Sequence, residues 1–169
     1  VRDFLISECT TEAYFQELAD QREHYDGFNL LAGDVRRGLL CWSNRDSVLN
    51  RIEPGCFGLS NRFFETPWPK VVKAKQLLVA AAEQARASAE DSFVEALFEI
   101  LKNSEQPVDA ELPNTGIGQE KERLLSSIFI QSKEYGTRCS TVILHRPDGQ
   151  LLFCERSYSP GAVEQSTAL

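Results

Sequence analysis

The chain has 169 residues, of which 42% are hydrophobic and 25% are charged, an ordinary composition for a folded globular protein. Its formal net charge is −7, so its surface repels phosphate backbones and nucleic acid is not an expected partner. No run of the sequence approaches the roughly 20 apolar residues of a membrane-spanning helix. The length suits one domain, expected over residues 1–158, with a flexible tail over 159–169.

The cysteines and histidines give no metal or disulfide pattern. Five cysteines form an odd set without a Cys-x-x-Cys pair, which argues against a disulfide framework and against a zinc knuckle. Neither His24 nor His145 has a carboxylate or cysteine at metal-ligand spacing. We therefore expect a reducing, cytoplasmic setting, no metal and no cofactor. The cysteines are Cys9, Cys41, Cys56, Cys139 and Cys154.

The sequence starts at Val1 and contains no methionine. Residues 1–6 have the pattern of the second half of a helix and lack a capping residue ahead of them. We therefore expect a segment of the same protein to precede Val1. A helix capped by Thr10 or Thr11 should follow. Its apolar side would consist of Tyr14, Phe15 and Leu18.

Three short strands are predicted next, separated by polar or glycine-containing turns. They cover residues 28–32, 39–42 and 48–52. Strands this close in sequence favour an antiparallel meander. Gly55 and Gly58, three residues apart in an apolar run, then indicate backbone that bends or is closely approached.

Two helices are predicted in the middle of the chain. Thr66 should cap the first, with Pro67 at its first position, where the missing N–H of proline costs nothing. The second should start near Ser88, with Asp91 three residues later in a variant of the capping box. Its regular apolar stripe is typical of packing on a core. The stripe consists of Phe93, Val94, Leu97, Phe98 and Leu101.

The C-terminal third is predicted to be mainly strand. Residues 104–118 are rich in Pro, Gly, Asn and acidic side chains and should form a long surface loop. Strands are expected over 124–130, 137–146 and 151–158.

The last two of these strands should form a hairpin. A two-residue loop at Asp148-Gly149 would place Ile143 opposite Cys154. Apolar residues would then lie on both sides of the hairpin, so both of its faces should be covered, as in a layered sandwich.

Two polar residues are candidates for a functional site. Asn61 lies between an apolar run and the predicted helix, where its amide could point into a cleft or simply complete a turn. Arg138 begins a predicted strand on the side of Val142 and Leu144. A guanidinium at the edge of an apolar face needs an acidic partner or an anionic ligand, and both remain open. The sequence contains no nucleophile-elbow or phosphate-loop motif.

Three tracts, in order, resemble a known family. They are Tyr25-Asp26-Gly27-Phe28-Asn29-Leu30-Leu31, then Gly58-Leu59-Ser60-Asn61 with Glu65-Thr66-Pro67-Trp68-Pro69-Lys70, and Tyr135-Gly136-Thr137-Arg138-Cys139-Ser140-Thr141-Val142-Ile143-Leu144. The family is the Asn-Arg-Asp-Glu (NRDE) family, also called transport and Golgi organisation protein 2. The resemblance extends from about Val1 to about Tyr158. Asn44-Arg45-Asp46 spells most of the family's name, but the motif belongs near the N-terminus and Ser47 replaces its Glu, so we interpret this tract as a turn.

The resemblance implies an α+β fold similar to the N-terminal-nucleophile hydrolases, an αββα four-layer sandwich with mainly antiparallel sheets. In that superfamily a cysteine after the initiator Met attacks an amide carbonyl, and its own α-amino group is the base. By the same resemblance, Asn61 matches a donor to the oxyanion and Arg138 a residue that orients nucleophile or substrate. None of the cysteines is terminal, so we expect no amidase activity from this chain alone.

Three functions remain open. The intact protein could be a cysteine amidohydrolase or acyltransferase acting on a small amide or thioester. The resemblance to the eukaryotic family instead implies a protein that binds or carries haem or lipid, although two His and no Met leave few axial ligands for haem. The third is a structural remnant without a ligand. A terminal cysteine beside Asn61 and Arg138 in one hollow between the sheets would favour the enzyme, and an apolar pocket without a nucleophile would favour the carrier.

Overall fold

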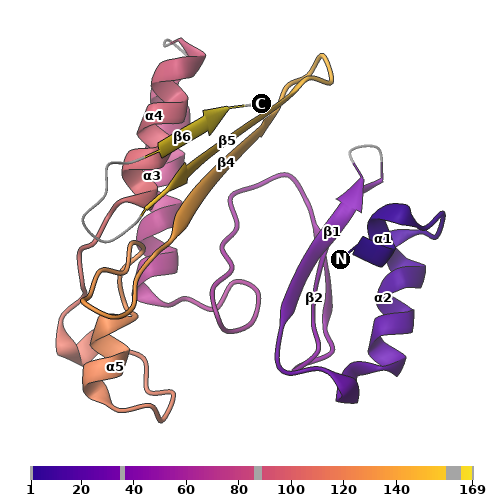
Figure 1. Cartoon of the computed structure of the whole chain (residues 1–169), viewed down its shortest axis with the longest axis horizontal. Coiled ribbons are helices and arrows are strands. Elements are labelled where there is room, and N and C mark those ends of the chain that lie inside the picture. The colour runs from indigo at the N-terminus through magenta and orange to yellow at the C-terminus, as the bar shows by residue number, and fades with distance from the viewer. Residues whose placement is uncertain (1, 35–36, 86–88, 159–164, 169) are drawn as a thin grey trace. The chain divides into compact units, whose positions relative to one another are not determined.

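The computed structural model describes residues 2–34, 37–85, 89–158 and 165–168 (Figure 1). Within these residues the chain forms five α-helices and two three-stranded antiparallel sheets. The α+β class is therefore confirmed. The chain divides into two compact units, Val1–Thr66 and Pro67–Leu169, which are described in turn. None of the described helices has the length and apolar character needed to cross a membrane.

The first unit begins with helices α1 (Arg2–Ile6) and α2 (Thr11–Asp20). Thr10 caps α2, since its Oγ1 accepts a hydrogen bond of 3.2 Å from the N–H of Ala13. This cap was predicted from the sequence and is confirmed. A short 3-10 helix, Arg22–His24, leads from α2 towards the sheet.

The three predicted strands of the meander are confirmed. They are β1 (Asn29–Asp34), β2 (Gly38–Ser43) and β3 (Leu49–Ile52), in the order β1-β2-β3. Because side chains alternate along a strand, Leu40 and Trp42 of β2 share one face of the sheet.

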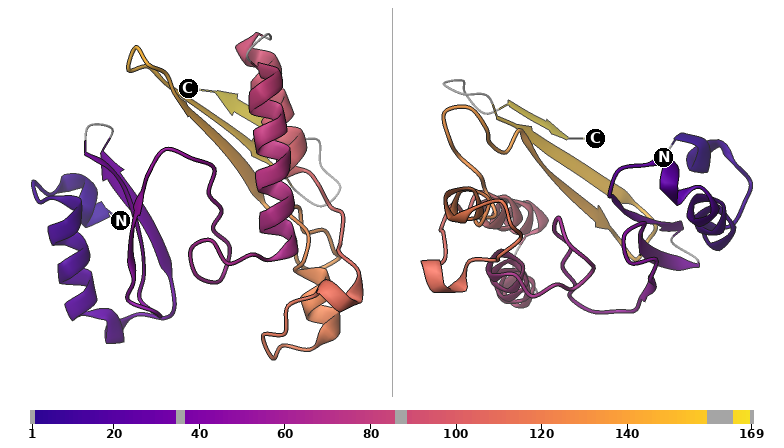
Figure 2. Two further views of the ribbon diagram at one scale, coloured as in Figure 1. Left: turned by 180° about the vertical axis from the view of Figure 1, so that it is seen from behind. Right: turned by 90° about the horizontal axis from the view of Figure 1, so that it is seen from below.

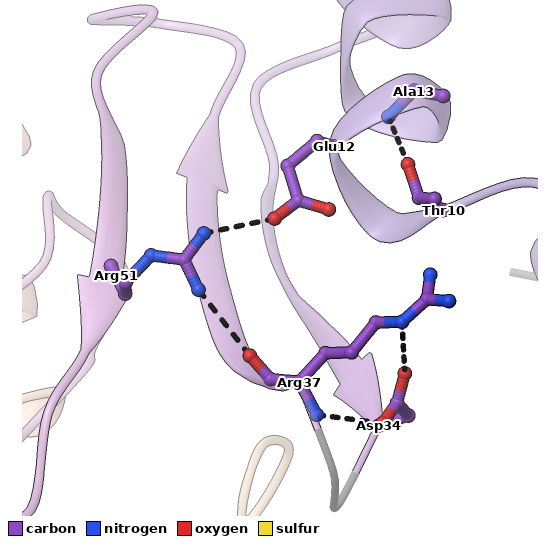
Figure 3. A network of polar contacts seen from close by, with 6 residues as sticks. All are labelled: Thr10, Glu12, Ala13, Asp34, Arg37 and Arg51. Carbon is purple, nitrogen blue, oxygen red and sulfur yellow. Dashed lines mark hydrogen bonds and ion pairs between the residues drawn. The ribbon is translucent and has the colours of Figure 1, made fainter.

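The core of the first unit lies between that face and α2. Tyr14 and Phe15 of α2 form one buried cluster with Leu40 and Trp42. The rings of Phe15 and Trp42 stack with centroids 6.1 Å apart. An ion pair of 2.9 Å between Arg51 and Glu12 adds a link from β3 to α2 (Figure 3).

The opposite face of this sheet carries exposed apolar side chains. Leu31 and Leu39, which alternate with the core residues, are 54% and 42% exposed, whereas Cys41 on the same face is buried. Within the first unit, helices therefore cover one face of the sheet.

The second unit opens with α3 (Pro69–Ala85), two residues later than predicted. Helical backbone is disfavoured at Trp68 because a proline follows it. Pro69 therefore takes the first helical position in place of Pro67. The carbonyl of Trp68 accepts the N–H groups of Val71 and Val72, at 2.9 and 3.0 Å. Thr66, the predicted cap, donates its hydroxyl to the carbonyl of Phe63 instead.

Helix α4 (Glu90–Leu101) follows Ala89, which provides no side-chain cap. The predicted cap, Ser88, lies outside the described residues. The apolar stripe is confirmed, because Val94 and Phe98 are buried and Leu97 and Leu101 pack beside them.

The strand predicted over 124–130 is wrong. The loop predicted over residues 104–118 contains a 3-10 helix at Asp109–Glu111. It leads into α5 (Gln119–Leu124), which is built from strong helix formers. The serines that follow bond to nearby backbone and so compete with strand pairing: the hydroxyls of Ser126 and Ser127 donate to the carbonyls of Arg123 and Phe129.

The C-terminal sheet has the order β4 (Cys139–His145), β5 (Leu151–Ser157), β6 (Gln165–Ala168). The β4–β5 hairpin is confirmed, but its register is shifted by one residue, so that Val142 faces Cys154. A two-residue loop would require an N–H from Pro147, which has none. The chain instead makes a three-residue loop ending at Gly149, whose φ of +88° suits glycine and whose N–H bonds to the carbonyl of Arg146.

One face of this hairpin packs on α4, where Val142 and Cys154 are buried against Phe98. Figure 2 shows the helices α3 and α4 along the same side of the sheet. Ile143 and Leu151 are 58% and 59% exposed, so the predicted cover of a second face stays a prediction.

The predicted domain bounds also stay a prediction. Of the predicted tail, residues 165–168 form β6, and 159–164 and 169 lie outside the described residues.

Candidate functional site

A cavity with a volume of about 780 Å³ lies in the first unit and is lined by Asn61, one of the two residues that the sequence predicts for the site. Three tracts line it. They are residues 27–29 at the start of β1, Ser43 and Arg45 at the end of β2, and residues 59–63. All three belong to the first unit, so the cavity is built without any residue of the second.

Two asparagines hold the lining tracts together. Asn44 accepts a hydrogen bond of 2.8 Å from the N–H of Phe28, and its amide nitrogen donates to the carbonyl of Asp26 at 3.0 Å. Asn29 donates from its amide nitrogen to the carbonyls of Ser60 and Arg62, at 3.2 and 2.7 Å. The cavity wall is therefore tied to the strands by side-chain bonds to backbone.

Gly27 allows the side chain of Arg45 to lie close against the backbone. A Cβ at position 27 would stand 2.3 Å from Nε of Arg45 and 3.0 Å from its Nη2. The backbone N–H of Arg45 donates to the hydroxyl of buried Ser43 at 3.3 Å. Because glycine has no Cβ, it allows the guanidinium to approach the backbone this closely.

The cavity is cationic although the chain is acidic. Arg45 and Arg62 line it, and no Asp or Glu is among its lining residues. Within the described parts of the chain, neither arginine forms an ion pair. The guanidinium of Arg62 lies 4.8 Å from the centroid of the Phe63 ring, a cation–π distance.

Asn61, the first predicted site residue, lines this cavity and is exposed. As far as the structure describes the chain, its side-chain amide has no hydrogen-bond partner. An amide in this state can donate to a ligand without first breaking a protein bond. The catalytic role of Asn61 stays a prediction.

Arg138, the second predicted site residue, belongs to the second unit. It is exposed and immediately precedes β4, and its carbonyl accepts the N–H of Tyr158 at 2.8 Å. Each of the two residues is described within its own unit. The predicted meeting of Asn61 and Arg138 in one hollow therefore stays a prediction.

The arginines of the cavity were not predicted from the sequence. The tract Asn44-Arg45-Asp46 does form the predicted turn, but that turn also delivers a guanidinium to the cavity. Only the fold brings Arg45 beside Gly27. The sequence signal was an arginine between two turn-forming residues, and residues of the turn-forming types are common in surface turns.

The second unit has a smaller cavity of about 470 Å³ beside Lys70. The ammonium of Lys70 donates to the carbonyl of Leu125 at 2.8 Å, and burial lowers the pKa of Lys70 below its usual value. Burial also raises the pKa of the Cys41 thiol. Among the described residues, no group of three or more His, Cys, Asp or Glu is placed to hold a metal ion.

Comparison with known proteins identifies the family. Residues 1–160 match the family described as Transport and Golgi organisation 2. The Transport and Golgi organization protein 2 homolog of Bos taurus is 36% identical over 93% of this chain and 60% of its own length. The corresponding homologs of Homo sapiens and Mus musculus are each 33% identical with the same coverage. The chain thus spans about 60% of the length of these relatives. It belongs to the Transport and Golgi organisation 2 family.

Proposed function

We propose that the intact protein is a cytoplasmic cysteine amidohydrolase or acyltransferase of the N-terminal-nucleophile type, acting on a small amide or thioester. In this proposal the nucleophile lies outside this chain, which supplies Asn61 and Arg138. The observation that carries it is the side-chain amide of Asn61, which lines the cavity and has no partner in the described structure. The sequence resemblance assigns the same residue to the oxyanion.

The proposal includes the αββα four-layer sandwich that the sequence resemblance implies. Each described sheet has helices on one face and exposed apolar side chains on the other, Leu31 and Leu39 in the first unit and Ile143 and Leu151 in the second. Covering such side chains is favourable by about 25 cal/mol for each Å² of apolar surface removed from water. This supports a fold in which each sheet is covered on both faces.

In the chemical step, a thiolate attacks the carbonyl carbon and negative charge develops on the carbonyl oxygen. An N–H of Asn61 would donate to that oxygen, and its donation would strengthen as the charge develops. Arg138 would orient the nucleophile or an anionic part of the substrate. Loss of one such donor costs about 100- to 1000-fold in kcat.

The test uses the intact protein with a butyryl thioester and a p-nitroanilide as probes. Asn61→Ala should lower kcat by about 100-fold or more with little change in KM, because the oxyanion exists only in the transition state. Asn114→Ala, at an exposed asparagine of the second unit outside both cavities, is the matched control. An Asn61→Ala protein that keeps its kcat would rule out the oxyanion role.

A second candidate is a protein that binds or carries haem or lipid without hydrolysing it. The specific observation in its favour is the pair of guanidinium groups, from Arg45 and Arg62, beside the apolar walls made by Phe28 and Phe63. Binding of such a ligand by the intact protein, with no turnover of either probe, would favour this function over the first.

A further inference from the structure

We propose that the cavity of the first unit binds an amphipathic small molecule through a single anionic group, a carboxylate or a phosphate, which Arg45 and Arg62 hold together. The proposal rests on the second candidate function, binding without hydrolysis, and names the class of ligand that would be bound. Its test reads binding directly, whereas the hydrolase function is tested by turnover, so each can fail alone.

The charge of the cavity selects the ligand's head group. Two arginines and no acidic residue line it, in a chain whose net charge is −7. Some exposed arginines of this chain pair with carboxylates, as Arg51 does with Glu12 and Arg22 with Glu23. In the described structure, Arg45 and Arg62 have no such partner. Their planar donors match the oxygens of a carboxylate or phosphate.

The backbone that carries both arginines is fixed before any ligand arrives. Asn44 secures the turn that presents Arg45, and the guanidinium of Arg45 lies against Gly27, where a Cβ would clash. The carbonyl of Arg62 is held by Asn29 at 2.7 Å. Tethered positions reduce the ordering entropy that a ligand must offset.

The rest of the cavity suits an apolar body rather than a bare inorganic anion. Phe28, Leu59 and Phe63 line it, and Phe28 is itself packed edge-on against Trp42 at 5.7 Å. A volume of about 780 Å³ lies within the range of about 300–1,000 Å³ that is usual for small-molecule sites. Asn61 adds an amide without a partner among the described residues, which can donate to a second polar group of the ligand.

The experiment is calorimetric titration of the 169-residue chain with four probes: octanoate, octyl phosphate, octan-1-ol and acetate. Octanoate or octyl phosphate should bind at least about tenfold more tightly than the alcohol, which lacks the charge. Whichever of the two binds more tightly identifies the head group. Acetate should bind about tenfold or more weakly than octanoate, because it leaves the apolar walls unfilled.

Three variants locate the binding. Arg45→Gln with Arg62→Gln in one protein should weaken binding of the tighter of the two anions, octanoate or octyl phosphate, by about tenfold or more. Gly27→Ala should weaken it in the same direction by displacing the guanidinium of Arg45, whose flexible end can move without disturbing the fold. Arg2→Gln removes an exposed positive charge away from the cavity and should leave the affinity unchanged.

The proposal would be overturned if neither octanoate nor octyl phosphate bound more tightly than octan-1-ol. Wild-type affinity in the folded Arg45/Arg62 double variant would also overturn it, as would wild-type affinity in Gly27→Ala if the double variant does not fold. Gly27→Ala also keeps the test decisive if the double variant fails to fold. Acetate binding as tightly as octanoate would show an adventitious anion site and would likewise overturn it.

Discussion

Asn29 offers a sharp test of how the cavity wall is held. Its amide nitrogen donates to the carbonyls of Ser60 and Arg62, at 3.2 and 2.7 Å. A protein hydrogen bond contributes about 0.5–1.5 kcal/mol net, so Asn29→Ala should lower the free energy of unfolding of the first unit by about 1–3 kcal/mol. Asn29→Asp should cost more at neutral pH, because it sets carboxylate oxygens against the same two carbonyls. Protonation at low pH would return one donor and part of the loss, so this variant's stability should fall as the pH rises.

The assay exploits the distribution of tryptophan. The sequence has two, Trp42 in the core of the first unit and Trp68 in the second. In a Trp68→Phe background, urea unfolding followed by fluorescence reports the first unit alone. Asn50→Ala is the control, since within the described part of the chain its amide makes only a 3.5 Å contact with the carbonyl of Val48. If Asn29→Asp unfolds at the wild-type urea concentration, the tie between β1 and the cavity wall does not exist.

Further predictions concern the two cores and the thiols. Leu40 is 2% exposed, so Leu40→Ala should destabilise the first unit by about 2–5 kcal/mol in the same urea assay. Leu39 is 42% exposed, so Leu39→Ala should cost under about 1 kcal/mol. Similar losses for the two variants would contradict the assigned core. Phe98→Ala should cost the second unit about 3–5 kcal/mol, read as faster amide exchange in α4, and unchanged exchange would contradict the packing. Because burial raises the pKa of the Cys41 thiol, iodoacetamide should modify exposed Cys9 quickly and Cys41 only in urea, as mass spectrometry would show; equal rates would refute this.

The elements that sequence analysis predicted well carry their signal locally. The hydroxyl of Thr10 and the stripe containing Val94 and Phe98 each specify a helix from residues within a few turns. Glycine-containing and polar turns likewise separate the three strands of the meander. These features depend on neighbouring residues, so tertiary packing had little to change.

The errors arose where two local rules competed. Trp68, placed before a proline, overrode the cap expected at Thr66. The missing N–H of Pro147 lengthened the hairpin loop and shifted the register of β4 against β5. Serine hydroxyls at 126 and 127 bonded to nearby carbonyls where an apolar run had favoured a strand.

The candidate site was only partly predictable for a different reason. Asn61 was found because it ends a recognisable tract, and it does line the cavity. Arg45 was not predicted because the sequence of its turn has no distinctive motif. Its position in the cavity depends on contact with Gly27, eighteen positions away along the chain. Contacts of that range are fixed by the pairing of β1 with β2, which spacing alone does not reveal.

The anion site in the first unit can be tested most directly by nuclear magnetic resonance of the isotopically labelled chain during titration with octanoate. The side-chain amide of Asn61 and the Nε–H groups of Arg45 and Arg62 should shift together and saturate with one dissociation constant, while Arg2 stays unchanged. Signals from these three side chains that do not move, or shifts confined to the second unit around Lys70, would contradict it.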